Sequence, residues 1–415
     1  MSESSHVIVV LGMHRSGTSA IARALKVLGI DLGPNLMPAE SNNEKGYWED
    51  LDVFALNEGL LEAVDASWDD LCPNIGSLVA SESVSPMRLR ASQLLTQKTA
   101  NAPWLGLKDP RIARLLPFWK PVFSELRVDV KYLLAFRNPL GVAASLAKRD
   151  GFPFQKSMYL WLEHVIPAVI DTQGHCRSAL DYDRLLTDPN SELRRVASDL
   201  GLGDRLNEHE LAQFCNDFLD PQLRHAQFTA KDLRNNSEIP ALVKDVFGAL
   251  VRVSSGELSA NSDAVDKEFS RFAESLHELH PLLTLLADTE RKAGGLRTSL
   301  LQRDEAVAAL EQELRERNAE LDALREAVLE RETRIAAALQ AAAERDDKIS
   351  RLVDMLTERE TEAEEMSQRL RDAIGERDAL LGSTSWRVTA PLRGAILLAR
   401  KSGLQAVGRF FSRPE

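Results

Sequence analysis

The chain has 415 residues, enough for two or three domains, and its 63 acidic and 51 basic residues give a formal net charge of −12. This acidic balance argues against a general nucleic-acid-binding protein. The three cysteines lie far apart, match no disulfide framework or metal-ligand spacing, and favour reduced thiols in the cytoplasm. No basic region precedes the first apolar run and no apolar run has the length of a membrane span, so neither a signal peptide nor a transmembrane helix is expected.

Residues 1–255 alternate apolar strand candidates with amphipathic helices, which predicts an α/β domain whose parallel sheet is covered on both faces. The strand candidates are residues 6–11, 104–107, 128–136 and 178–182. A capping side chain followed by proline predicts helix starts at Ser85-Pro86, Asp109-Pro110, Asn138-Pro139 and Asp188-Pro189. Three further regions are predicted: a helical linker at 256–295, a coiled coil at 296–381 and a basic amphipathic tail at 382–415.

The first strand candidate leads into a glycine-bounded loop, after which apolar residues recur at helical spacing. The loop reads Gly12-Met13-His14-Arg15-Ser16-Gly17-Thr18-Ser19, and its two glycines are five residues apart, as in a nucleotide-binding P-loop. In a strand–loop–helix unit of this kind, backbone N–H groups converge on an oxyanion and the helix dipole favours negative charge. A plain glycine turn between a strand and a helix is the structural alternative.

The loop departs from that of a nucleotide triphosphatase at the position of the lysine. Thr18 stands where the lysine would contact the β- and γ-phosphates, and the cation, Arg15, lies inside the loop. A planar guanidinium suits an oxyanion that carries no metal. The loop therefore predicts a phosphate next to a less charged, transferable group, and no metal is expected there.

A second candidate anion site begins where the strand at 128–136 ends. Arg137 follows that strand, and Ser145 lies eight residues later, about two turns into the next helix. Because the chain bends back between them, both side chains can face one phosphate near the strand end. The structural alternative is a serine on the helix surface.

The two motifs together resemble those of the sulfotransferases that use 3′-phosphoadenosine-5′-phosphosulfate (PAPS), in particular bacterial, carbohydrate-type members. GMHRSGTS is similar to their loop for the 5′-phosphosulfate, FRNPLGVAASLAKR is similar to their 3′-phosphate motif, and YDRLLTDP and DPQLRH resemble later segments. The resemblance covers roughly residues 6–230. It implies a P-loop-like three-layer α/β/α fold and transfer of a sulfuryl group from PAPS. The residues implied for the 5′ side are His14, Arg15, Ser16, Gly17, Thr18 and Ser19, and those for the 3′-phosphate are Arg137 and Ser145.

Sulfuryl transfer needs a base for the acceptor's proton and a cation near the bridging oxygen. Many family members use a glutamate shortly after the first helix, and the candidates here are Glu49 first and Glu44 second. Lys108, at a strand end, resembles a family lysine that contacts the bridging oxygen or the acceptor. The structural alternatives are a helix-dipole role for Glu49, an ion pair of Lys108 with Asp109, and a loop histidine of no special role at His14.

Between Gly295 and Gly375 the sequence contains neither proline nor glycine and fits a heptad frame. One core position is apolar in ten successive heptads, from Val307 to Leu370, whereas arginines interrupt the partner position every other heptad. This pattern predicts a coiled coil about 120–130 Å long, joining copies of the chain or a partner protein. A lone solvated helix is the alternative.

The segment after Gly382 combines several arginines with apolar and aromatic residues, which is typical of a helix at an anionic membrane surface. Docking on the coil or on a partner protein is the alternative. SWRVTAPLR resembles a tail of bacterial polysaccharide-assembly enzymes, which implies a glycan or glycolipid acceptor near the inner membrane. Two other functions stay open at this point, a P-loop kinase-like phosphotransferase and a non-catalytic coiled-coil scaffold.

Overall fold

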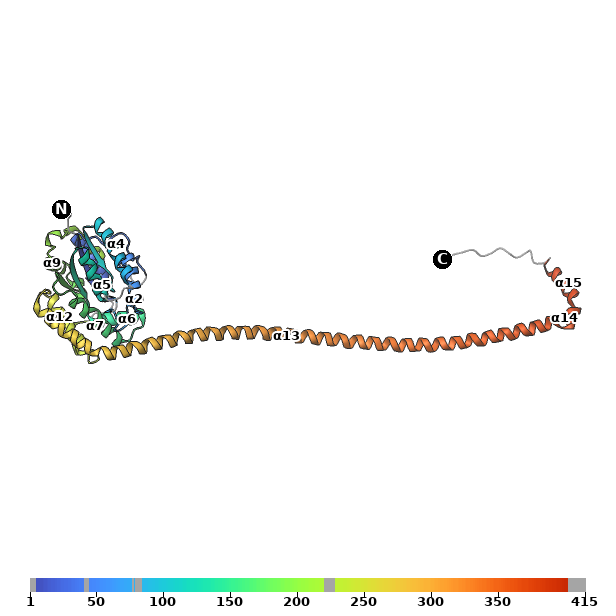
Figure 1. The fold of residues 1–415 in the computed structure, drawn as a ribbon. Coiled ribbons are helices and arrows are strands. Elements are labelled where there is room, and N and C mark those ends of the chain that lie inside the picture. The colour runs from blue at the N-terminus through green and yellow to red at the C-terminus, as the bar shows by residue number, and fades with distance from the viewer. Residues whose placement is uncertain (1–4, 41–44, 77, 79–83, 220–227, 402–415) are drawn as a thin grey trace. The chain divides into compact units, whose positions relative to one another are not determined.

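The computed structural model describes residues 5–40, 45–76, 78, 84–219 and 228–401, with side chains to residue 397. The chain divides into two compact units, Met1–Ser299 and Leu300–Glu415. The first unit holds the sheet and both candidate anion motifs, so it is the unit that positions the candidate site (Figure 1).

The sheet of the first unit has four parallel strands in the order β2-β1-β3-β4. The strands are β1 His6–Leu11, β2 Trp104–Lys108, β3 Asp129–Phe136 and β4 Arg177–Asp181. In register, Val10 of β1 pairs with Lys108 of β2 on one side and with Leu133 of β3 on the other. The carboxyl ends of the two central strands and of β2 therefore lie together at one edge of the sheet, where the loop after β1 begins.

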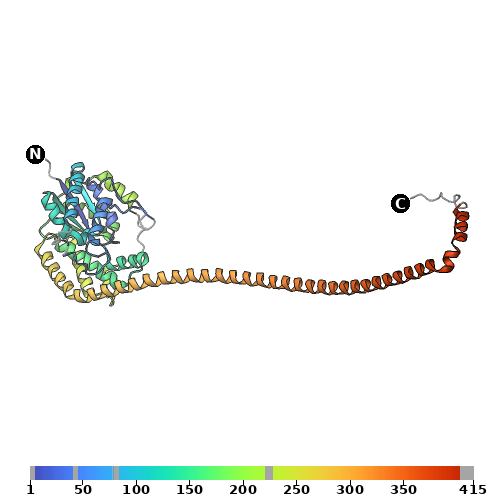
Figure 2. The same cartoon turned by 45° about the vertical axis from the view of Figure 1, so that its right-hand side comes forward.

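Alternation along β1 divides the core into two layers. Val7, Val9 and Leu11 pack into a large cluster with the helices α2, α4, α5, α6, α7 and α12. Ile8 and Val10 point to the opposite face and pack with α1, α9 and α10. Helices thus cover both faces of the sheet, which makes three layers (Figures 1 and 2).

The helices have the following bounds: α1 Thr18–Ala24, η1 Leu25–Leu28, α2 Leu51–Glu62, α4 Ser85–Asn101, α5 Ile112–Glu125, α6 Pro139–Asp150, α7 Phe154–Ile170, α8 Tyr182–Thr187, α9 Pro189–Asp199, η3 Gly203–Arg205, α10 Glu208–Gln213, η4 Phe214–Phe218, α11 Ala230–Asn235, α12 Ala241–Ser254, α13 Asp263–Gly382, α14 Thr384–Val388 and α15 Ala390–Lys401. No helix within the described residues is long and apolar enough to cross a bilayer.

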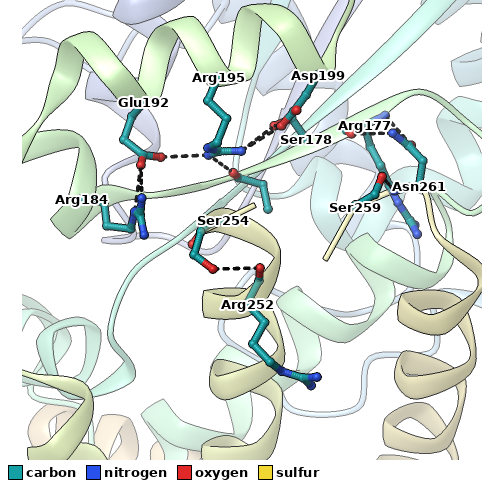
Figure 3. A network of polar contacts seen from close by, with 12 residues as sticks. Arg177, Ser178, Arg184, Glu192, Arg195, Asp199, Arg252, Ser254, Ser259 and Asn261 are labelled. Atoms are coloured by element: carbon teal, nitrogen blue, oxygen red, sulfur yellow. Dashed lines mark hydrogen bonds and ion pairs between the residues drawn. The ribbon is translucent and has the colours of Figure 1, made fainter. Parts of the chain in front are cut away.

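A buried arginine joins the edge strand β4 to the segment that opens α13. Arg177 donates from Nε to the carbonyl oxygen of Ala260 (2.8 Å), and its Nη2 pairs with Asp266. Its backbone N–H donates to Asn261 Oδ1 at 3.0 Å (Figure 3). On the other face of the sheet, Ser178 and α9 are linked by a hydrogen bond from Ser178 Oγ to Asp199 Oδ2 (2.7 Å), also drawn in Figure 3. These bonds hold β4 in place, and its carboxyl end leads into α8 at Tyr182.

The predicted fold class, a parallel α/β sheet with helices on both faces followed by a long helix and a further amphipathic helix, is confirmed. The predicted helix starts at Asn138 and Asp188 are confirmed, and both side chains cap their helices. Helix α4 begins at Ser85 itself, without a side-chain cap, and the predicted start at Asp109 is wrong. Asp109 Oδ1 does accept from the N–H of Arg111, but the turn that follows is closed by a bond from the N–H of Ile112 to the carbonyl oxygen of Asp109, three residues earlier, so α5 begins only at Ile112.

Candidate active site

The loop between β1 and α1 has the curved backbone of an anion-binding turn. Arg15 (φ 67°) and Gly17 (φ 79°) both adopt left-handed conformations, and the N–H of Ser16 donates to the carbonyl oxygen of Met13 at 3.2 Å. A positive φ is uncommon for a residue with a side chain, so the conformation of Arg15 is held by its surroundings.

Both loop glycines are required by close packing. A Cβ at Gly12 would lie 2.3 Å from the carbonyl oxygen of Ala135 on β3, and one at Gly17 would lie 2.0 Å from the ring of Tyr182. Gly17 additionally needs its positive φ. The glycine spacing noted in the sequence therefore brings the loop against β3 and against the residue that opens α8.

A direct hydrogen bond joins the two predicted anion motifs. Arg15 Nε donates to Ser145 Oγ at 2.7 Å, although the residues are 130 positions apart. Arg137, at the end of β3, stacks its guanidinium on the ring of Tyr182 (5.1 Å to the ring centre). Burial and then the charges of Arg149 and Arg137 lower the pKa of Arg15, which places these cations in one region. The loop after β1 and the motif after β3, which were predicted as two anion sites, therefore lie side by side.

Apart from Nε2 of His14, two polar groups at this location have no hydrogen-bond partner among the described residues. They are Oγ of Ser16, whose residue is 0% exposed, and Nε of Arg137, whose nearest carboxylate oxygen, on Asp183, is 4.0 Å away. An unpaired buried polar group costs about 1–3 kcal/mol, so such groups ordinarily meet a ligand or water. A hydroxyl without a partner, and a guanidinium whose Nε makes no hydrogen bond and only a long ion pair with Asp183, fit an oxyanion beside Arg15.

Lys108, at the end of β2, connects the loop with the predicted base. Its ammonium group donates to Glu49 Oε1 (2.5 Å), to the carbonyl oxygen of Tyr47 (2.9 Å) and to Ser19 Oγ (3.3 Å). Lys108 and Glu49 are only 3% and 4% exposed. Lys108 is therefore a buried partner of Glu49, not a surface partner of Asp109, and it lies within reach of the first turn of α1.

Glu49 lies just before α2 and does not serve as a helix-dipole residue, because Asp50 caps that helix by accepting from the N–H groups of Asp52 and Val53. Burial raises the pKa of Glu49, and the neighbouring Lys108 offsets part of that effect. Arg111 approaches the second carboxylate oxygen at 3.7 Å. A carboxylate with raised proton affinity next to a lysine is a combination suited to general base chemistry.

A buried hydrogen-bonded chain supports this carboxylate from behind. Trp119 Nε1 donates to Asn57 Oδ1 (2.9 Å), and Asn57 Nδ2 donates to Asp109 Oδ2 (3.0 Å). Asp109 Oδ1 accepts from Nη1 of Arg111 at 3.0 Å. The orientation of Arg111 beside Glu49 is thus set by this chain together with the ion pair between its Nε and Glu58 on α2.

His14 is neutral at physiological pH, because burial and the charge of Arg111 lower its pKa well below the usual value. Its ring packs against Trp68 with 4.2 Å between ring centres, and its Nε2 has no hydrogen-bond partner among the described residues. Arg149 lies over the other part of the Trp68 ring, 5.3 Å from its centre. His14 can therefore offer a neutral nitrogen beside the loop but no charge.

The other predicted site residues divide between the site and its margins. Thr18 is buried at the start of α1, and Ser19 contacts Lys108. Glu44 and the DPQLRH segment lie outside the described residues. Trp48, next to Glu49 in the sequence, packs its ring on Phe218 (6.1 Å between ring centres).

Sequence reasoning missed Arg111, Arg149 and Tyr182. In the sequence, Arg111 was visible only as the last residue of Lys-Asp-Pro-Arg, and Arg149 only as a residue of the helix that carries Ser145. Tyr182 begins YDRLLTDP, a segment whose family resemblance was noted but whose contacts with Gly17 and Arg137 appear only in the fold.

No protein-family model and no curated protein matches the chain. Among solved structures, the chain is similar to the sulfotransferase domain of the olefin synthase of Synechococcus PCC 7002. The two have 15% sequence identity and a TM-score of 0.32, and the alignment covers 67% of this chain and 97% of that domain. At this level the likeness assigns no activity, so the function of the chain has to be argued from its own residues.

Proposed function

We propose that the chain is a sulfotransferase that moves a sulfuryl group from PAPS to a hydroxyl group. The observation that supports this proposal is the hydrogen bond from Arg15 to Ser145, which joins the loop that we propose for the 5′-phosphosulfate to the motif that we propose for the 3′-phosphate. The unpaired Ser16 Oγ and Arg137 Nε are the groups that would hold the two ends of the nucleotide donor. Thr18 at the position of the P-loop lysine argues against a kinase.

The reaction assigns a distinct task to each half of the Glu49–Lys108 pair. Glu49 accepts the proton of the acceptor hydroxyl as that oxygen forms a bond to sulfur. Lys108 neutralises the charge that grows on the oxygen between sulfur and phosphorus as that bond breaks and 3′-phosphoadenosine-5′-phosphate leaves. Ser19, which already contacts Lys108, keeps this ammonium group near the loop.

Titration calorimetry on the full chain with 3′-phosphoadenosine-5′-phosphate tests the proposal. We expect micromolar binding that magnesium does not change. A parallel titration with ATP and magnesium separates the kinase alternative: binding of ATP but not of the adenosine bisphosphate would replace the proposal. Transfer of label from PAPS to a glycan acceptor separates an enzyme from a scaffold, because a scaffold gives binding without transfer.

For the acceptor we propose a glycan or glycolipid at an anionic membrane surface, reached with the help of the tail. In the described part of the tail, Arg393 lies over Trp386 (3.4 Å to the ring centre) while Ile396 and Leu397 are exposed. Deleting residues 383–415 is therefore expected to abolish flotation of the protein with anionic vesicles. Equal flotation of the truncated and full chains would contradict a membrane role for the tail.

We further propose that residues 300–382 of α13 pair with a second copy of the chain. The apolar row at the predicted core position is solvent-exposed in the single helix, with Val307, Leu314, Leu321, Val328, Ile335, Ile349, Leu356 and Leu370 each 51–62% exposed. Burying a leucine of this kind contributes about 1.5–3 kcal/mol. Sedimentation equilibrium should give a dimer or larger oligomer for the full chain.

The double substitution Leu314→Lys and Leu321→Lys should convert that oligomer to a monomer, because it places charges in the row that pairs. Glu326→Lys, on the opposite side of the predicted heptad frame, is the matched control and should leave the oligomer intact. A monomeric wild-type chain would reject the pairing.

A further inference from the structure

Three metal-binding side chains from distant parts of the first unit meet outside the candidate active site. Cys72 lies in the connection between α2 and α4, Glu163 lies on α7, and His280 lies on α13. One donor atom of each side chain is within 4.8 Å of the other two. Cys72 and Glu163 are 91 residues apart, and Glu163 and His280 are 117 residues apart. The spacing of cysteines along the sequence therefore does not indicate this cluster.

The distances within the cluster are those between ligands of one small metal ion. Cys72 Sγ lies 3.3 Å from Glu163 Oε1, and His280 Nε2 lies 3.6 Å from the same oxygen. Zinc bonds of about 2.0–2.3 Å in a tetrahedral site place neighbouring ligands roughly 3.3–3.5 Å apart. The His280–Glu163 distance is already close to this range, and the Cys72–His280 separation, at most 4.8 Å, has to shorten by up to about 1.5 Å for all three to reach one ion.

The remaining contacts of Glu163 orient its free oxygen toward the cluster. Arg114 Nη2 donates to Oε2 at 3.2 Å, and the N–H of Cys72 donates to the same oxygen at 3.3 Å. Oε1 is left facing Cys72 and His280. Groups that fix a ligand from behind in this way are a common part of metal sites, where they set ligand direction.

We propose that Cys72, Glu163 and His280 bind a zinc ion that ties the connection before α4, helix α7 and the first part of α13 together. One sulfur, one nitrogen and one carboxylate oxygen suit zinc, whereas magnesium and calcium prefer oxygen ligands throughout. His280 is 42% exposed, which leaves a route for the ion and room for a water as fourth ligand. On binding, the thiol proton of Cys72 passes to solvent.

The metal-free alternative is a simple hydrogen bond. Burial and the Glu163 carboxylate raise the pKa of the Cys72 thiol to about 12, so without a cation the neutral thiol donates to that carboxylate. The zinc site contains a metal ion and the hydrogen-bonded pair does not. Measuring the zinc content of the protein therefore distinguishes the two arrangements.

A metal here would act on the parts of the fold that it joins. The segment that carries Cys72 also carries Trp68, whose carbonyl oxygen accepts from Arg114 (3.1 Å) and whose ring packs on His14. Helix α13 enters the same region with Phe269, Leu276 and Leu283 buried in the core of the first unit. Zinc would brace both elements at once.

The test uses the untagged full-length chain, stripped with a chelator and titrated with zinc and, in parallel, with cobalt. We expect one zinc per chain, a thiolate-to-cobalt charge-transfer absorption in the near ultraviolet, and a zinc-dependent rise in melting temperature. Cys72→Ser and His280→Gln should each weaken zinc binding at least about tenfold, and Cys72→Ser should remove the charge-transfer band.

Cys215→Ser and His209→Ala, which change the same residue types outside the cluster, are the matched controls and should bind like the wild type. Both test variants preserve side-chain size, and their circular dichroism without metal shows whether they fold. Absence of stoichiometric zinc in the wild type, or equal zinc binding by Cys72→Ser, His280→Gln and the controls, would overturn the proposal. The donor titration is independent of this result, so each proposal can fail separately.

Discussion

Replacing Glu49 with glutamine is expected to lower the rate of sulfuryl transfer by about 10²–10⁴-fold, the usual contribution of a general base. Glutamine keeps the shape of the side chain and can still accept from Lys108, whose ammonium group is 2.5 Å away. The affinity for 3′-phosphoadenosine-5′-phosphate should therefore stay within a few-fold of the wild type. Initial rates with labelled PAPS and titration calorimetry measure the two quantities.

The pH profile gives the same prediction a second readout. Because burial raises the pKa of Glu49, the ionised base is lost as the pH falls through a value above the ordinary pKa of about 4.3. The acid limb of kcat/KM should therefore lie above that of an ordinary glutamate and should disappear in the glutamine variant. Glu62→Gln, at the exposed end of α2, is the control.

Transfer by Glu49→Gln at close to the wild-type rate would remove Glu49 as the base. The parallel variant Glu44→Gln then decides whether the second candidate takes its place. If both variants are active, the Glu49–Lys108 pair is a structural strut between the start of α2 and the end of β2.

Replacing Arg137 with alanine is expected to weaken binding of 3′-phosphoadenosine-5′-phosphate by roughly 10–150-fold, because a hydrogen bond to a charged group contributes about 1.5–3 kcal/mol. The guanidinium stacks on Tyr182 and has an Nε without a hydrogen-bond partner among the described residues, so it is placed and unsatisfied. Arg137→Lys should recover only part of the affinity, since lysine lacks the planar fork.

Arg194→Ala on α9 removes an arginine of the same unit that pairs with Glu208 at the surface, and it should bind like the wild type. Adenosine 5′-phosphate offers a further control, because it lacks the 3′-phosphate and should bind wild type and Arg137→Ala equally. An unchanged affinity of Arg137→Ala for the bisphosphate would reject Arg137 as the 3′-phosphate ligand.

The fold was predictable because its strands are short apolar runs, two of which, β2 and β3, are followed closely by a cap-and-proline pair. Residues 128–136 were assigned almost as the structure has them, with β3 at Asp129–Phe136. The start of α5 was predicted too early. Asp109 accepts from the N–H of Arg111 as a cap would, but the turn after it is closed by a bond between residues three apart and precedes the α-helix.

The candidate site was predictable where contiguous residues determine the local backbone conformation, as in the loop from Gly12 to Ser19. It was less predictable where residues from different elements meet. Arg111, Tyr182 and the Cys72–Glu163–His280 cluster carry no local signal, because their partners lie from about 50 to more than 100 residues away in the chain. Only the packing of the helices brings them together.

A chain of hydrogen bonds runs from Trp119 through Asn57 and Asp109 to Arg111. Through this chain, buried residues influence the reactivity of Glu49. Asn57 has no exposed surface and touches no candidate ligand, yet its amide holds the carboxylate that aims Arg111 at Glu49. An unbiased mutational screen for activity should therefore score Asn57 as sensitive as residues of the loop itself. A natural substitution at this buried position would thus change the proton affinity of Glu49 without altering any surface residue.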